Sequence, residues 1–333
     1  MDNFENDKVN TTNENLSGSE QKTDLQENNN VTLTNSEVSP EEQVAVKPNM
    51  FCRFKKWFKD FFTYNPVGRR PRIWELDLIR GIILFFVTLD HVCLFAYYWK
   101  MIQYKTAFGQ VLENFSVFYL ESYFRKFVEP IGLWTLCFLS GISCQFSRSS
   151  MRRMAKFWII TAVFMGGYAI LHFIIPDLIT GTFIFNIVPI LTISMTLWYV
   201  IDHFSVPMVY RIIGAGLITT MGLVFFAIFK LKPGGFWVEN PFLAILVYNQ
   251  NGFVVSPNNF EPLFPHLGFF FLGGIFGRYF YKDKRTKFKS LNPPKALSPI
   301  LLLGKHSLKA FLFLPFIILA VVWVLVRFVW LFL

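Results

Sequence analysis

The chain has 333 residues, of which 53% are hydrophobic and 19% aromatic, and its formal net charge is +10. Its long apolar runs exclude a purely soluble domain and indicate an integral membrane protein. Its basic residues are scattered between these runs, which argues against nucleic acid as a partner and favours cytoplasmic loops and anionic membrane lipids.

Residues 1–49 are rich in Asn, Glu, Ser, Thr and Gln, and they hold ten acidic residues against three lysines. Such a segment cannot bury enough apolar surface to offset its ordering entropy, so we predict a disordered acidic cytoplasmic tail. Residues 50–71 interleave basic and aromatic side chains and are too charged to span a membrane. We expect them to lie at the inner interface as an amphipathic segment.

The remaining chain, residues 72–333, is predicted to be an all-α membrane bundle of about seven transmembrane helices. Basic residues cluster after the second and sixth spans, whereas residues 177–182 contain none. This asymmetry predicts a multi-pass protein of the cell membrane with a cytoplasmic N-terminus. The predicted spans are residues 73–97, 127–147, 157–176, 183–201, 212–231, 262–281 and 307–332.

Two segments expected on the outer side are long. Residues 98–126 are predicted to contain a short interfacial helix. Residues 232–261 begin with Pro-Gly-Gly and carry an apolar run too short to span, so they are expected to be re-entrant or to cap an outer cavity. The sequence shows no internal repeat of the kind that transporters often have.

The stretch of residues 73–99, which contains the first predicted span, carries Asp77, Arg80, Asp90 and His91. Ionisable residues at membrane depth are costly, so they should face protein or a water-filled cavity. Arg80 and His91 are eleven residues apart, which places them on one helix face roughly 16 Å apart along the axis. Asp77 is three residues before Arg80 and can pair with it. The alternative is a structural ion pair with a histidine satisfied by a neighbouring helix.

The chemistry of these side chains favours group transfer. A histidine such as His91 can take a proton from a hydroxyl or amine at neutral pH, or carry an acyl group itself. A guanidinium such as that of Arg80 can hold the phosphates of coenzyme A through charge-assisted hydrogen bonds.

Further polar residues open the sixth and last spans. Glu261 and His266 flank two prolines at the outer end of the sixth span, where the alternative is a histidine that caps the helix. Lys305 and His306 precede the last span at cytoplasmic phosphate depth, where the alternative is interfacial snorkelling, and Ser307 is predicted as its N-cap. The four cysteines form no CxxC pair, and no metal site is predicted.

Four motifs in order resemble the heparan-α-glucosaminide N-acetyltransferase catalytic-domain family, which belongs with the wider transmembrane acyltransferases, including acyltransferase family 3. The first is the Arg-x10-His pattern of Arg80 and His91. The others are FLSGISCQFSRSSMRR at 138–153, FEPLFPHLGFFFLGGIFGR at 260–278 and LLGKHSL at 302–308. The resemblance covers roughly residues 72–315.

The resemblance implies a membrane acyltransferase that binds acetyl-CoA from the cytoplasm and passes the acetyl group to an acceptor across the membrane. His91 would be the catalytic residue. Together with the residue chemistry, this gives a prediction of an extracytoplasmic glycan hydroxyl or amine as acceptor. Asp77, Arg80, Lys305, His306 and Ser307 are expected on the coenzyme side, and Glu261 and His266 on the acceptor side.

Two other functions stay open. The family usually has histidines where this chain has Pro189 and Leu314, so a non-catalytic relative acting as a scaffold or partner subunit is the alternative. A transporter of a polar solute is the third, and the missing repeat counts against it. The identity of the acceptor and the oligomeric state are left open.

Overall fold

The computed structural model describes most of the chain after residue 72. The predicted acidic tail and the basic-aromatic segment therefore lie outside the described residues. The chain divides into two units, residues 1–53 and 54–333, and every described residue belongs to the second. The described ranges are 73–98, 107–146, 150–174, 184–232, 237–256, 260–283, 285–287 and 295–331.

These residues form eleven α-helices and one 3-10 turn, and no strand occurs among them. The all-α prediction is confirmed for this part of the chain. The helices are α2 Trp74–Tyr98, α3 Ala107–Glu121, α4 Tyr123–Cys144, α5 Ser150–Ile174, α6 Ile187–His203, α7 Met208–Leu231, α8 Pro241–Ala244, α9 Gln250–Val255, α10 Leu263–Phe280, α11 Ser298–Lys305 and α12 Ser307–Leu331.

Each of the seven predicted spans coincides with one long helix, namely α2, α4, α5, α6, α7, α10 or α12. By length and composition, three helices qualify as candidate spans: α4, α7 and the Met151–Ile174 part of α5. The α11–α12 pair, bent by 97°, raises the number to four if it is taken as one span. The structure therefore shows a helical protein with several candidate membrane spans, and it does not show seven.

Side-chain caps explain where two of the long helices begin, α4 and α6. The Ser122 hydroxyl accepts a hydrogen bond from the Arg125 amide at 3.1 Å and starts α4. The Asn186 carbonyl oxygen accepts from the Val188 amide at 3.1 Å and starts α6. Serine and asparagine favour this position because they satisfy amides that have no partner inside the helix.

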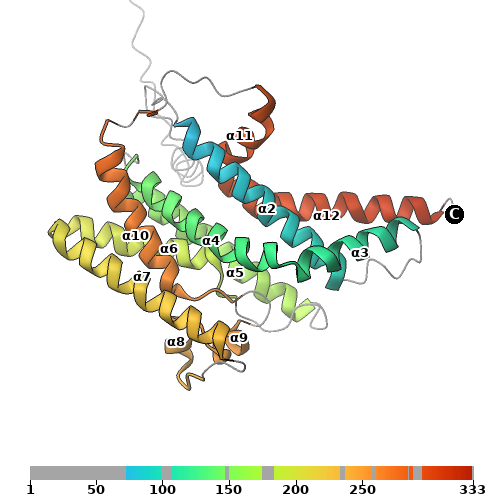
Figure 1. Ribbon diagram of the computed structural model, residues 1–333, viewed down its shortest axis with the longest axis horizontal. Coiled ribbons are helices and arrows are strands. Elements are labelled where there is room, and N and C mark those ends of the chain that lie inside the picture. Colours follow the sequence, from blue (N-terminus) through green and yellow to red (C-terminus); the bar gives the residue numbers. More distant parts are fainter. Residues whose placement is uncertain are drawn as a thin grey trace, which may run out of the picture. The chain divides into compact units, whose positions relative to one another are not determined.

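The core lies around α10, which packs against α4, α7 and α6 (Figure 1). Helices α4 and α10 approach closely because glycines line their contact: a Cβ added at Gly141 would lie 2.0 Å from the Phe270 carbonyl oxygen. Small residues at such contacts let helix backbones meet. The main core cluster includes the buried Cys137, Ile190, Trp198, Leu267 and Phe270.

Substitution of Gly141 by alanine is expected to destabilise the protein by about 2 kcal/mol or more, because the added methyl group collides with backbone atoms of α10. Gly166 on α5 is the matched control, since a Cβ there would meet nothing within 4 Å and alanine favours helix. Thermal unfolding of both variants in detergent checks this. Equal stability of the two variants would contradict the close α4–α10 contact.

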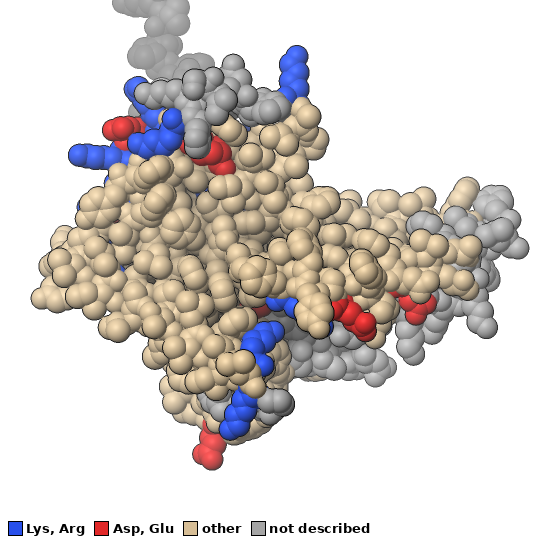
Figure 2. Space-filling model, viewed as in Figure 1, with Lys and Arg blue, Asp and Glu red and all other residues tan. Residues whose placement is uncertain are grey.

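Helix α2 forms a second centre of packing, with α11, α12, α3 and α4 as neighbours (Figure 1). Helix α3 occupies the predicted position of a short helix in residues 98–126, and α8 and α9 lie within residues 232–261. On the face drawn in Figure 2, the charged side chains gather toward two opposite ends, and a broad band between them has almost none. This distribution is typical of a protein that faces lipid around its middle.

Candidate functional site

Arg80 makes three polar contacts, two of which join α2 to α4. Its Nη1 lies 3.0 Å from Asp77 Oδ1, so the pair expected from their spacing is formed. Its Nη2 donates to the Leu139 carbonyl oxygen at 3.2 Å and to the Ser143 hydroxyl. Arg80 and Asp77 keep 15% and 16% of their side-chain surface exposed. The guanidinium is therefore held in a fixed orientation while part of it stays accessible.

The break between α11 and α12 lies against this end of α2. A Cβ added at Gly304 would lie 1.7 Å from the Asp77 carbonyl oxygen, so only glycine permits this approach. Lys305, His306 and Ser307 follow directly, and Ser307 is the first residue of α12, with His306 between the two helices. The structure thus brings the five residues predicted on the coenzyme side to one end of α2.

Sequence reasoning missed Glu75, which ties the α10–α11 connection to the same end of α2. This carboxylate is 7% exposed and accepts hydrogen bonds from the Thr286 hydroxyl at 2.7 Å and the Lys287 amide at 2.9 Å. A cavity of about 560 Å³ lies beside it, lined by Asp283, Arg285, Thr286 and Lys287. The available signal was a second carboxylate beside Asp77 in the first turn of α2, followed far along the chain by a basic loop.

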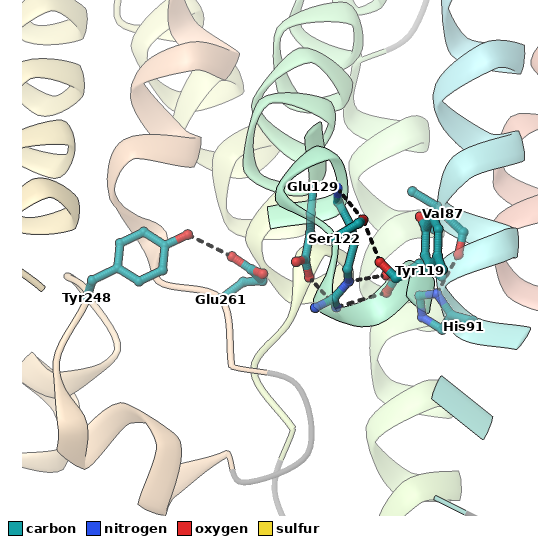
Figure 3. Close-up of polar contacts among 9 residues, drawn as sticks. Val87, His91, Tyr119, Ser122, Glu129, Tyr248 and Glu261 are labelled. Carbon is teal, nitrogen blue, oxygen red and sulfur yellow. Dashed lines mark hydrogen bonds and ion pairs between the residues drawn. The ribbon is translucent and has the colours of Figure 1, made fainter. Parts of the chain in front are cut away.

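His91 lies toward the other end of α2 and is half-buried. Its Nδ1 is 2.7 Å from the Val87 carbonyl oxygen (Figure 3), and its ring lies edge-on to Phe311 of α12, with 6.4 Å between centroids. Because a carbonyl oxygen only accepts, Nδ1 carries the proton of the neutral ring and Nε2 keeps its lone pair. Nε2 is therefore the atom that can act as a base or nucleophile.

A network of three charges lies beside His91 along α2, and its members were not predicted to interact. Arg125 Nε donates to Asp90 Oδ1 at 2.5 Å, and its Nη2 reaches Asp90 Oδ2 at 3.4 Å and Glu129 Oε1 at 3.2 Å. Figure 3 shows Glu129, Ser122 and Tyr119 between His91 and Glu261. The network fixes the C-terminal half of α2 to the start of α4.

The two residues predicted on the acceptor side lie together with a tyrosine from the α8–α9 segment. Tyr248 donates to Glu261 Oε2 at 3.1 Å (Figure 3), and His266 Nε2 is 3.5 Å from the same oxygen. His266 is fully buried and its Nδ1 donates to the Pro262 carbonyl oxygen at 2.7 Å. Among the described residues, its Nε2 has no hydrogen-bond partner. The contact with Pro262 lies in the first turn of α10 and is not the helix cap considered as the alternative, since the N-cap residue is Pro262 itself and no side chain caps the helix.

Glu261 precedes α10 and lies outside the candidate spans. Burial, and after it the nearby charge of Glu129, raises the pKa of the Glu261 carboxyl to about 8. A carboxyl whose pKa is raised in the folded state stabilises folding where it is protonated. This contribution is full below pH 4.5, the ordinary value, and is lost as the pH rises through about 8.

We therefore expect the Tm of the wild-type protein to fall between about pH 5 and pH 8 because Glu261 must ionise in a buried site. Glu261→Gln keeps the shape of the side chain and cannot ionise, so its Tm should fall less across the same range. Thermal unfolding of both proteins at matched pH values checks this. Parallel curves would show that another group causes the decline.

Two polar regions lie along α2, one around Arg80 and one around His91. A second cavity of about 330 Å³ runs along α11 and α12, with His306, Lys309 and Leu314 among its lining residues. Neither this cavity nor the one beside Glu75 is lined by Arg80 or His91. Within the described residues, no group of three or more His, Cys, Asp or Glu side chains could hold a metal ion.

The helices and the two polar regions define a class, the helical membrane proteins with ionisable groups along one helix. The family described as "Heparan-alpha-glucosaminide N-acetyltransferase, catalytic" matches residues 72–315, and the chain belongs to this family. Comparison with curated proteins and with solved structures found no match. The family implies a membrane acetyltransferase that uses acetyl-CoA as donor.

Proposed function

We propose that this protein transfers an acetyl group from cytoplasmic acetyl-CoA to a hydroxyl or amine of an extracytoplasmic glycan. The observation that carries the proposal is that one helix, α2, holds a partly exposed guanidinium in one half and, in the other, a histidine whose Nδ1 is bound to a backbone carbonyl oxygen. A cation suits phosphates and an imidazole suits proton transfer. The family match supports the same reaction.

The proposed topology has seven spans in the cell membrane, with the N-terminus in the cytoplasm. It places the Arg80 end of α2 toward the cytoplasm and the His91 end toward the outer side. The basic residues that follow α4 and α10 support this orientation, because such residues concentrate on the cytoplasmic side.

On the donor side, Arg80 and Lys305 bind phosphates of acetyl-CoA, with His306 and Ser307 beside them, and Asp77 orients Arg80. The residues fit this ligand, since Arg80 presents an oriented guanidinium and both Lys305 and His306 are exposed where α11 and α12 meet. A guanidinium recognises phosphate through paired hydrogen bonds, which gives orientation as well as affinity.

On the acceptor side, His91 Nε2 takes the proton of the attacking hydroxyl or amine. As the new C–O or C–N bond forms, the C–S bond of the thioester breaks, and the proton passes to the departing thiolate. Glu261 and His266 hold the acceptor near His91. If His91 instead carries the acetyl group, the reaction has two half-steps, and ping-pong kinetics would distinguish this route.

The test is transfer of labelled acetyl from acetyl-CoA to membrane glycans in vesicles from cells that express the protein. The proposal predicts acceptor labelling above that of vesicles without the protein. It also predicts that acetyl-CoA raises the Tm of the purified protein, because a ligand that binds the folded state stabilises it. Absence of both labelling and stabilisation would overturn the proposal.

The second candidate is a non-catalytic relative that acts as a scaffold or partner subunit. Two positions where the family usually has histidine favour it. Pro189 is buried at the start of α6, and Leu314 lines the second cavity, along α11 and α12. Neither side chain can transfer a proton. The vesicle test separates the two candidates, since a scaffold would label no acceptor.

A further inference from the structure

Two guanidinium groups converge on one residue at the C-terminal end of α4. Arg80 of α2 donates to the Ser143 hydroxyl, and Arg153 of α5 donates from Nη1 to the Ser143 carbonyl oxygen at 2.7 Å. The positive charge of Arg153 repels that of Arg80. Three separate helices therefore bring two like charges together at this point.

The charges at this point do not balance. Asp77 pairs with Arg80 at 3.0 Å, whereas Arg153 forms no ion pair with any described acidic residue. Carbonyl groups at a helix C-terminus stabilise cations, but by about 0.3–1 kcal/mol each. Two arginines and one aspartate leave a net positive charge in a partly buried place, which an anion would compensate.

The surroundings suit a phosphate group. Ser143 orients both guanidinium groups, so their remaining N–H donors are available in a fixed arrangement. Gly304 packs against the Asp77 backbone, which brings Lys305 to the same end of α2. The paired N–H donors of a guanidinium group match the oxygens of a phosphate, and two guanidinium groups bind a dianion better than one.

We propose that Arg153 is a second phosphate-binding residue, which together with Arg80 forms a two-guanidinium site for a phosphate of the nucleotide end of the acyl donor. This inference rests on the proposed function, because it identifies a further residue of the same donor site. It assigns a binding role to the first turn of α5, whose basic residues otherwise explain only topology.

The experiment compares Arg153→Gln with Arg152→Gln in purified full-length protein. Each variant removes one positive charge from the start of α5, and Arg153 is the residue whose guanidinium donates to the Ser143 carbonyl oxygen. Loss of a charge-assisted hydrogen bond of about 1.5–3 kcal/mol corresponds to a roughly 10- to 100-fold rise in Kd. We expect this rise for CoA in Arg153→Gln and a change within about twofold in Arg152→Gln.

A second ligand and a third variant keep the test decisive. Pyrophosphate should compete with CoA for wild-type protein and compete less well for Arg153→Gln. Arg153→Lys keeps the positive charge without the paired donors of the guanidinium group, so it should bind CoA with intermediate affinity. This variant remains usable if Arg153→Gln does not fold.

The outcomes separate the two proposals. Equal CoA affinity of wild type, Arg153→Gln and Arg153→Lys would overturn the role of Arg153 and leave the acetyltransferase proposal standing. Equal weakening by Arg152→Gln and Arg153→Gln would show general electrostatic attraction and would also overturn it. Wild-type protein that binds neither CoA nor pyrophosphate would contradict the proposed function itself.

Discussion

Substitution of His91 by alanine is expected to lower acetyl transfer by about 10²- to 10⁴-fold, because a positioned general base contributes on this order. The Nδ1 of His91 is bound to the Val87 carbonyl oxygen, so the proton-accepting nitrogen is Nε2. Binding of acetyl-CoA should change little. The measurement is labelled acetyl transfer in vesicles together with acetyl-CoA affinity of the purified variant.

His203→Ala is the matched control for this variant. His203 ends α6, is exposed, and stacks on Tyr199 with 6.0 Å between ring centroids. Removing it deletes the same side chain at a place with no proposed role, so transfer should stay near that of wild type. Wild-type transfer by His91→Ala would exclude His91 as base or acyl carrier.

Substitution of Arg80 by alanine is expected to weaken CoA binding strongly and to destabilise the protein by about 3 kcal/mol, because it breaks the ion pair with the mostly buried Asp77 carboxylate. The Leu139 carbonyl oxygen and the Ser143 hydroxyl also lose a donor. Isothermal titration with CoA and thermal unfolding measure the two effects separately.

Arg211→Ala is the control that distinguishes a loss of CoA binding from a loss of stability. Arg211 is a buried arginine of α7 that pairs with Asp202 at 3.0 Å and donates to the Val206 carbonyl oxygen at 2.9 Å. Its loss should destabilise the protein to a similar degree and leave CoA affinity unchanged. If Arg80→Ala and Arg211→Ala weaken CoA binding equally, Arg80 has only a structural role.

Much of the helical architecture could be predicted from the sequence, because apolar runs of 20 residues or more are strong local signals. Helix α11 could not. It has eight residues, with Pro299 near its start and Gly304 near its end, and so short a helix depends on its neighbours for stability. Its contact with α2 supplies that stability, and no local pattern reveals such a contact.

The candidate site likewise contains some contacts that the sequence predicts and others that it does not. The Asp77–Arg80 pair could be predicted because a spacing of three residues brings side chains together on any helix. Ser143 lies 63 residues from Arg80, and Arg125 lies 35 residues from Asp90. Such partners are set by how the helices pack, and periodicity within one helix carries no information about them.

The account depends on α2 serving one reaction across the membrane, with the donor at its Arg80 end and the acceptor at its His91 end. Sealed vesicles of opposite orientation test this most directly, with labelled acetyl-CoA supplied only outside. The account predicts acceptor labelling in inside-out vesicles with wild-type protein, and none with His91→Ala or in right-side-out vesicles. Equal labelling of right-side-out vesicles that exclude acetyl-CoA would contradict it.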